Sequence, residues 1–210
     1  MDPGGIGTIR INGGRLCLDF SNTATYRGAE VLHDFLASYR DLLTWGGRVG
    51  LLSRAELRTK LGWAGSHPEQ AAGAHAAALR LRAALRNLFL TGPSAANLAH
   101  ITTINAALAD AAASCRITPG AGGYAYAANA DAVHWLAGPV AIAAAALATS
   151  PDFARVRRCG GQGCEWLFLD LSRAGTRRWC SMASCGNRAK ARSHYAKSKP
   201  VAARRKARSR

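Results

Sequence analysis

Apolar residues recur at helical spacing along much of the first 150 residues, which predicts a mostly helical domain. The clearest stretch begins at Pro68 and Glu69, which suit the first turn of a helix, and runs to about Leu90. One of its faces carries four apolar residues, Ala78, Leu81, Leu85 and Leu88. Arg82 and Arg86 share another face; such a pair is more often solvated, although it could clamp an anion.

The same region predicts four more helices. Phe35 to Trp45 has a helical pattern that Gly46-Gly47 should end, and Ser53 can cap a short helix over residues 54–61 that Gly62 should end. Ser94 can cap a helix with apolar positions at Leu98, Ile101 and Leu108. Asp131 can cap a last helix to about Thr149, which is hydrophobic almost all round, as is typical of a central core helix.

Two segments favour extended structure instead. After Gly13-Gly14, apolar residues alternate at Leu16, Leu18 and Phe20, which predicts a short strand or an extended lead-in. The segments 115–118 and 124–127 flank a glycine-rich tip and predict a β-hairpin. The polar residues Asp19, Asn22 and Arg27 follow the first segment; turn chemistry explains them best, and a pocket is the alternative.

Charge is distributed very unevenly over the 210 residues. The chain has a formal net charge of +16, yet residues 1–154 hold 12 basic and 10 acidic residues, and residues 155–210 hold 16 basic and 2 acidic ones. A near-neutral body therefore carries a strongly basic C-terminal quarter, which points to nucleic acid or another anionic surface as the partner.

The chain shows no pattern for membrane insertion or export. Its longest apolar run, Trp135 to Ala148, is too short to span a bilayer, and the N-terminus lacks a secretory signal pattern. We therefore expect a cytoplasmic protein without a membrane partner, where disulfides rarely persist. Cys17 and Cys115 stand alone in apolar surroundings and are expected to be free buried thiols.

The other four cysteines form two Cys-x4-Cys pairs, Cys159 with Cys164 and Cys180 with Cys185. Two tight turns that each present two thiolates can supply the tetrahedral site that zinc prefers. We expect one structural zinc ion that is closed to water and not catalytic; disulfides or an iron–sulfur cluster are the alternatives. Two short strands, 166–169 and 178–180, should deliver the two pairs. His194 is rejected as a ligand because four cysteines already close the site.

The residues after Cys185 favour a helix over 186–199, ended by Pro200. Little of this helix is apolar, so cations cover most of its surface, and a basic tail over 200–210 is expected to be disordered when free. We expect nucleic-acid contacts from the basic side chains Arg188, Lys190, Arg192, Lys197 and Lys199, helped by Arg177 or Arg178.

Arg188 and three aromatic residues of this region also have structural interpretations. Arg188 could instead hold the finger together, for example through Asp170. Trp166 and Trp179 are more often part of a finger core than platforms for stacked bases. Tyr195 could pack on the helical domain.

Two sequence patterns in this chain resemble known families. Arg177-Arg178-Trp179-Cys180-Ser181-Met182 followed by Cys185-Gly186-Asn187-Arg188 is similar to the CGNR zinc finger, and Cys164-x3-Phe168-x-Asp170 matches the upstream half of that pattern. The start Gly14-x-Leu16-Cys17-Leu18-Asp19-Phe20-x-Asn22-Thr23, with the region of Trp45, resembles the ABATE domain that commonly precedes this finger. The resemblance implies a bacterial, stress-induced transcription regulator with a C-terminal DNA-binding zinc finger.

Taken together, these patterns predict a mainly α fold with a small β-hairpin. An Ala-rich, ABATE-like helical domain (1–150) should precede a small treble-clef-like CGNR zinc finger of short strands and one helix (151–199) and the basic tail (200–210). The predicted function is zinc-dependent DNA binding in transcription regulation, with the N-terminal domain sensing a small-molecule ligand or forming a homodimer. The alternatives are an RNA-binding zinc module and a zinc–thiolate redox sensor. No catalytic motif stands out, so an enzyme is not expected.

Overall fold

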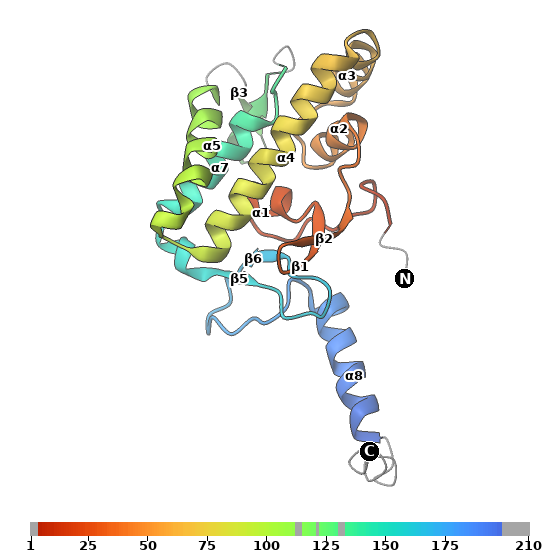
Figure 1. Cartoon of the computed structure of the whole chain (residues 1–210), viewed down its shortest axis with the longest axis vertical. Helices are drawn as coiled ribbons and strands as arrows, with labels where there is room; N and C mark the ends of the chain where they lie inside the picture. The colour runs from red at the N-terminus through yellow and green to blue at the C-terminus, as the bar shows by residue number, and fades with distance from the viewer. Residues whose placement is uncertain (1–3, 112–114, 121, 130–132, 199–210) are drawn as a thin grey trace.

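The computed structural model describes residues 4–111, 115–120, 122–129 and 133–198, and helices make up most of this part of the chain (Figure 1). The strands form three separate antiparallel pairs, β1–β2, β3–β4 and β5–β6. In chain order the elements are α1 Leu16–Ser21, β1 Ala24–Arg27, β2 Glu30–Asp34, α2 Tyr39–Arg48, α3 Arg54–Ser66, α4 Pro68–Thr91, η1 Ala95–Asn97, α5 Leu98–Ala109, β3 Cys115–Gly120, β4 Gly123–Ala128, α7 Ala137–Ala148, η2 Pro151–Arg155, β5 Val156–Arg158, β6 Leu167–Leu169, η3 Met182–Gly186 and α8 Asn187–Ser198.

Several predicted elements are confirmed. The long helix α4 has Pro68 at its start, and Ser53 caps α3 through a reciprocal pair of bonds with Glu56. The hairpin β3–β4 and the apolar helix α7 are also present. The predicted start of α7 is wrong, because the helix begins at Ala137 after Leu136; the expected cap Asp131 itself lies outside the described residues. None of the helices in the described ranges is both long and apolar enough to cross a membrane.

The prediction of an extended segment over residues 16–20 is wrong, because these residues form α1. Cys17, Leu18 and Phe20 are all completely buried, and the helix contacts α4, α7 and β6. A helix that is buried on nearly every side needs apolar residues on all faces, so its sequence shows no helical period. Burial also raises the pKa of the Cys17 thiol to about 12, so Cys17 is a free, inert core thiol.

Two glycine stops are also misplaced, because α2 continues through Gly46-Gly47 to Arg48 and α3 continues through Gly62 to Ser66. α2 also begins later than expected, at Tyr39, after a capping box between Ser38 and Asp41. A Cβ atom on Gly46 would lie 2.3 Å from Cη2 of Trp135, so glycine is present here to admit the buried Trp135 ring.

The arginine pair of α4 is buried, so the expectation of a solvated face is wrong. Arg82 forms two bonds with the Asp34 carboxylate, and Arg86 pairs with Glu165 at 3.2 Å while its guanidinium lies 3.6 Å from the Tyr26 ring centre. Both arginines are only 5% exposed. A buried arginine needs such partners because an unpaired charge in the interior is costly.

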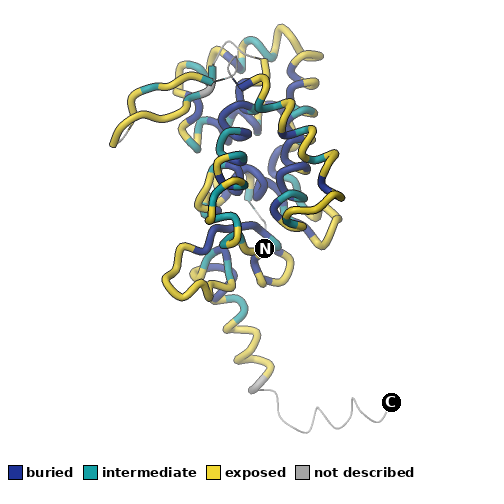
Figure 2. Tube along the Cα trace, turned by 90° about the vertical axis from the view of Figure 1, so that its left-hand side faces the viewer, coloured by how far each residue is buried: buried dark blue, intermediate teal, exposed yellow. Residues whose placement is uncertain are grey.

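One hydrophobic core extends from the helices into the C-terminal segment. Trp45, Phe20 and Trp135 are buried among the helices, and the buried β6 strand belongs to the same cluster. Figure 2 shows this continuous buried interior, with the β3–β4 hairpin and α8 exposed outside it. The division of the chain after residue 150 stays a prediction.

Candidate metal centre and nucleic-acid interface

Four cysteine sulfurs converge at one point near the base of α8. The Sγ atoms of Cys159, Cys164, Cys180 and Cys185 all lie within 4.8 Å of one another, and all four residues are buried. The Sγ atoms of Cys164 and Cys180 are 3.7 Å apart, and those of Cys180 and Cys185 are 3.8 Å apart. A tetrahedron with Zn–S bonds of about 2.3 Å has S···S edges of about 3.8 Å.

These separations fit a zinc site and not disulfides, whose S–S bond is about 2.05 Å long. The four thiolate donors would surround one structural zinc ion and leave no coordination position for water. A zinc ion can act as a Lewis acid or as a cross-link between chain segments. With all four coordination positions occupied by sulfur, the ion would serve as a cross-link.

The first cysteine pair sits on a turn that only glycine permits. The Cys159 backbone N–H donates to the Trp166 carbonyl at 2.8 Å, and the Cys164 N–H donates to the Gly161 carbonyl at 3.0 Å. A Cβ atom on Gly161 would lie 2.9 Å from the Cys185 sulfur and 3.3 Å from the Cys159 sulfur. The glycine therefore lets the turn fold directly over the sulfur cluster.

The second pair is held against this turn, but not by the expected strand. Residues 178–180 are irregular, and β6 pairs instead with β5, the segment immediately before Cys159. The Arg178 carbonyl accepts a bond from the Gly160 N–H at 3.0 Å, which ties the two pairs together. The prediction of a strand over 178–180 is wrong. β6 pairs with β5, which precedes it in the chain, and the two strands form a short hairpin whose loop holds the first cysteine pair.

Three donors face the sulfur atoms. The backbone N–H groups of Gly161 and Cys180 lie 3.4 Å and 3.3 Å from the Cys159 sulfur, and Nη2 of Arg188 lies 3.1 Å from the Cys185 sulfur. Hydrogen bonds with the other three cysteines are the main cause of a lowered pKa of Cys185, and the positive charge of Arg188 lowers it further. The three donors favour the thiolate forms of Cys159 and Cys185, the two sulfurs that they contact, whereas hydrogen bonds from neighbouring cysteines raise the pKa of Cys164 and Cys180.

Arg188 therefore contacts the metal centre itself, and its expected contact with Asp170 is not formed. The Asp170 carboxylate instead accepts bonds from the Ser172 hydroxyl and backbone N–H and from the Arg177 N–H. The Ser172 hydroxyl contributes most to a lowered pKa of Asp170, and the two backbone donors add to it. Asp170 thus orders the loop that leads to the second cysteine pair.

The two expected arginines before Cys180 are largely engaged within the finger. Arg177 donates to the carbonyls of Trp179 and Cys180, and its guanidinium lies 4.4 Å from the Phe168 ring centre. The guanidinium of Arg178 lies 5.4 Å from the Trp179 ring centre. Arg178 has the more available charge, and the contribution of either residue to nucleic-acid binding stays a prediction.

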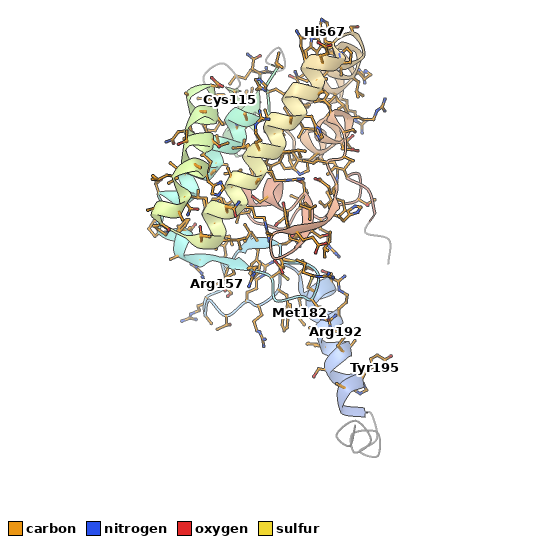
Figure 3. The ribbon with its side chains drawn as sticks, in the orientation of Figure 1. His67, Cys115, Arg157, Met182, Arg192 and Tyr195 are labelled. Carbon is orange, nitrogen blue, oxygen red and sulfur yellow. The ribbon has the colours of Figure 1, made fainter. Side chains whose placement is uncertain are left out.

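α8 leaves the zinc site and projects away from the body (Figure 1). Lys190 and Arg192 are exposed on it, and Arg192 and Tyr195 point outward in Figure 3. Tyr195 is 71% exposed, so its expected packing on the helical domain is not observed. Lys197 lies on the same helix, and Lys199 and the basic tail fall outside the described residues.

The N-terminal half of the chain is hydrogen-bonded to the finger through residues whose role could not be predicted from the sequence. The buried Asn22 side chain accepts a bond from the Leu167 N–H and donates to the Leu167 carbonyl, each at 2.8 Å. Trp166 donates from Nε1 to the Ala24 carbonyl at 2.8 Å. Asn22 therefore serves neither a pocket nor a local turn, because its partner lies in the other half of the chain.

Glu165, next to Cys164, is the second point of attachment. It has a φ of 53°, and its carboxylate accepts bonds from Arg86 and from the Gly28 N–H while lying 3.7 Å from Arg158. Asp19, by contrast, has a local role and accepts a 2.7 Å bond from the Gly13 N–H, and Arg27 forms a loose exposed pair with Glu30. Only a long-range contact signal could have identified the link through Glu165.

A cavity of about 500 Å³ opens between the two halves of the chain beside the metal centre. Its lining includes three of the sulfur-bearing residues together with basic side chains, namely Cys164, Cys180, Cys185, Arg10, His33 and Arg188. The four cysteines are themselves buried, so the cavity borders the sulfur cluster without exposing it.

Comparison with known families identified two matches. The ABATE model, described as "Putative stress-induced transcription regulator", matches residues 14–151, and the CGNR zinc finger model matches residues 155–198. A search of curated proteins found no match.

Proposed function

The chain belongs to the ABATE family and carries a CGNR zinc finger, and on that premise we propose that it is a cytoplasmic, zinc-dependent DNA-binding transcription regulator and not an enzyme. The observation that carries the proposal is α8, which starts at the zinc site and presents exposed cations away from the body (Figure 1). A helix anchored on a metal site is a common way to present basic side chains to a DNA groove.

The charge of α8 favours a polyanionic partner. The helix contains four basic residues and no acidic one, and Lys190 and Arg192 are exposed. Phosphate contacts from such residues release counterions, so binding should weaken steeply as salt increases. We propose that Lys190, Arg192, Lys197 and Lys199 face DNA, with Arg178 at the edge of the surface.

Arg188 and Arg177 have a different place in this proposal. Arg188 lies 3.1 Å from a zinc-site sulfur, and Arg177 is bonded to carbonyls inside the finger. Both residues would mainly hold the platform, and any DNA contact would be secondary. The N-terminal domain would sense a ligand or mediate assembly as a homodimer.

The test is fluorescence anisotropy of a mixed-sequence DNA duplex across a salt series. We expect the logarithm of the association constant to fall linearly with the logarithm of salt, and Lys190→Ala with Arg192→Ala to reduce the slope by about 2, one for each lost phosphate contact. The matched control changes Arg40 and Arg58, two exposed arginines of the N-terminal domain, to alanine. A shallow salt dependence, or an equal effect of the control, would overturn the proposal. Preferential binding of structured RNA in a competition assay would favour the RNA-binding alternative.

The cavity beside the metal centre favours one second function, a zinc–thiolate redox sensor. Three of the ligand residues line a cavity of about 500 Å³, so a peroxide that enters it would lie beside the sulfur cluster. Oxidation of two thiolates to a disulfide would release the zinc and loosen the base of α8. Measuring zinc release during hydrogen peroxide titration tests this function, which is excluded if the zinc remains bound while free thiols in the same solution are oxidised.

A further inference from the structure

The helical domain contains a second cavity, along the part of α4 that precedes the contact between Arg86 and Glu165. It has a volume of about 440 Å³ and lies between α4, α5 and the residues that lead into α7. Its size falls within the range of about 300–1,000 Å³ that is typical of small-molecule sites.

The cavity exists because two helices face each other with alanines. Ala74, Ala77 and Ala78 of α4 lie opposite Ala106 and Ala107 of α5, and these short side chains leave the space between the helices unfilled. The buried side chains of Leu81, Trp135 and Leu136 complete an apolar floor. Such a floor suits an aliphatic or aromatic body and offers little to a strongly polar one.

The rim of the cavity carries a cation that the fold does not use. Arg80 lines the rim and is exposed, and within the described part of the chain its side chain makes no hydrogen bond or ion pair. In contrast, Arg82 and Arg86 on the same helix are both paired with carboxylates. Asp110 is the acidic residue of the lining and is engaged in an interaction of its own.

We propose that this cavity binds a small amphipathic acid, with its apolar body between α4 and α5 and its single carboxylate at the Arg80 guanidinium. The proposal rests on the ligand-sensing role proposed for the N-terminal domain and assigns a site and a ligand class to it. Apolar burial would supply the affinity, and the charge-assisted bond with Arg80 would select an acid over its neutral counterpart.

Occupation of this cavity also has a direct route to the finger. α4 lines the cavity with Leu81 and, further along the same helix, holds Glu165 with Arg86. Glu165 directly follows the zinc-site residue Cys164. α4 therefore joins the cavity to the residue beside the first cysteine pair.

The experiment uses the zinc-loaded full chain without DNA and two probes, 1-naphthoate and its uncharged counterpart 1-naphthamide, in isothermal titration calorimetry. We expect 1-naphthoate to bind about fivefold more tightly than 1-naphthamide, because an ion pair at an exposed arginine is worth up to about 1 kcal/mol. Arg80→Gln should abolish this preference, whereas Arg40→Gln, a change at an exposed arginine of α2, should preserve it.

A second pair of variants tests the location. Ala106→Phe should fill the cavity and weaken 1-naphthoate at least tenfold, whereas Ala99→Phe, on the same helix but outside the lining, should leave binding within about twofold. Thermal melting of each variant checks that it is folded. Equal affinity for the two probes, no binding of either, or unchanged binding in Ala106→Phe would overturn the proposal. DNA affinity is measured separately, so failure of DNA binding remains distinguishable from failure of this site.

Discussion

Replacing Asn22 with alanine should destabilise the whole protein, because this side chain joins its two halves. Asn22 is 1% exposed, and its amide pairs with both the N–H and the carbonyl of the equally buried Leu167 at 2.8 Å. In Asn22→Ala both backbone groups lose their partner without gaining water. A buried polar group left unpaired costs about 1–3 kcal/mol, so two such groups should cost about 2–6 kcal/mol.

Urea unfolding of the zinc-loaded protein, followed by tryptophan fluorescence, measures this loss. The expected loss is a large part of the free energy of unfolding of a folded domain, which is usually about 5–15 kcal/mol. The matched control is Asn105→Ala at an exposed asparagine of α5, which should change stability by less than about 0.5 kcal/mol. Leu167 follows Cys164 by three residues, so zinc transfer to a chromogenic chelator should also be faster in Asn22→Ala. A loss below about 1 kcal/mol, or one equal to the control, would refute the link.

Two further changes test the core. Gly46→Ala should lower the free energy of unfolding in urea by about 1–3 kcal/mol, because its Cβ would clash with Trp135. The control Gly62→Ala has nothing near its Cβ and should be neutral or stabilising. Equal effects of the two changes would contradict the packing argument. Burial raises the pKa of Asp19 from 3.8 to about 6, so the folded state holds a proton that the unfolded state has lost, and stability should fall as pH rises from about 4 to about 6. Asp19→Asn should remove this pH dependence of stability. If the free energy of unfolding of Asp19→Asn and of the wild type changes with pH in parallel, Asp19 does not have the raised pKa.

Local signals in the sequence predicted the elements that depend on neighbouring residues. The equal spacing of the cysteine pairs predicted the zinc site, and Pro68 and Ser53 marked the starts of α4 and α3. These features need only nearby residues or a repeated motif, so they can be read directly from the chain.

Features set by distant partners could not be predicted in the same way. Gly46 continues a helix because Trp135 occupies the space beside it, and Arg86 is buried because Glu165 comes from the finger. The alternation of Leu16, Leu18 and Phe20 predicts an extended segment, but these residues form α1, because burial on nearly every side removes the helical period. In each case the deciding contact joins residues that are far apart in the sequence.

We propose that zinc held by the four cysteines fixes the base of α8 and so enables DNA binding. The most direct test measures the duplex affinity of one sample by anisotropy as zinc is removed with a chelator and then restored. We predict that affinity falls in proportion to the zinc lost and recovers when one equivalent is returned. DNA binding that is unchanged in the zinc-free protein would contradict the claim.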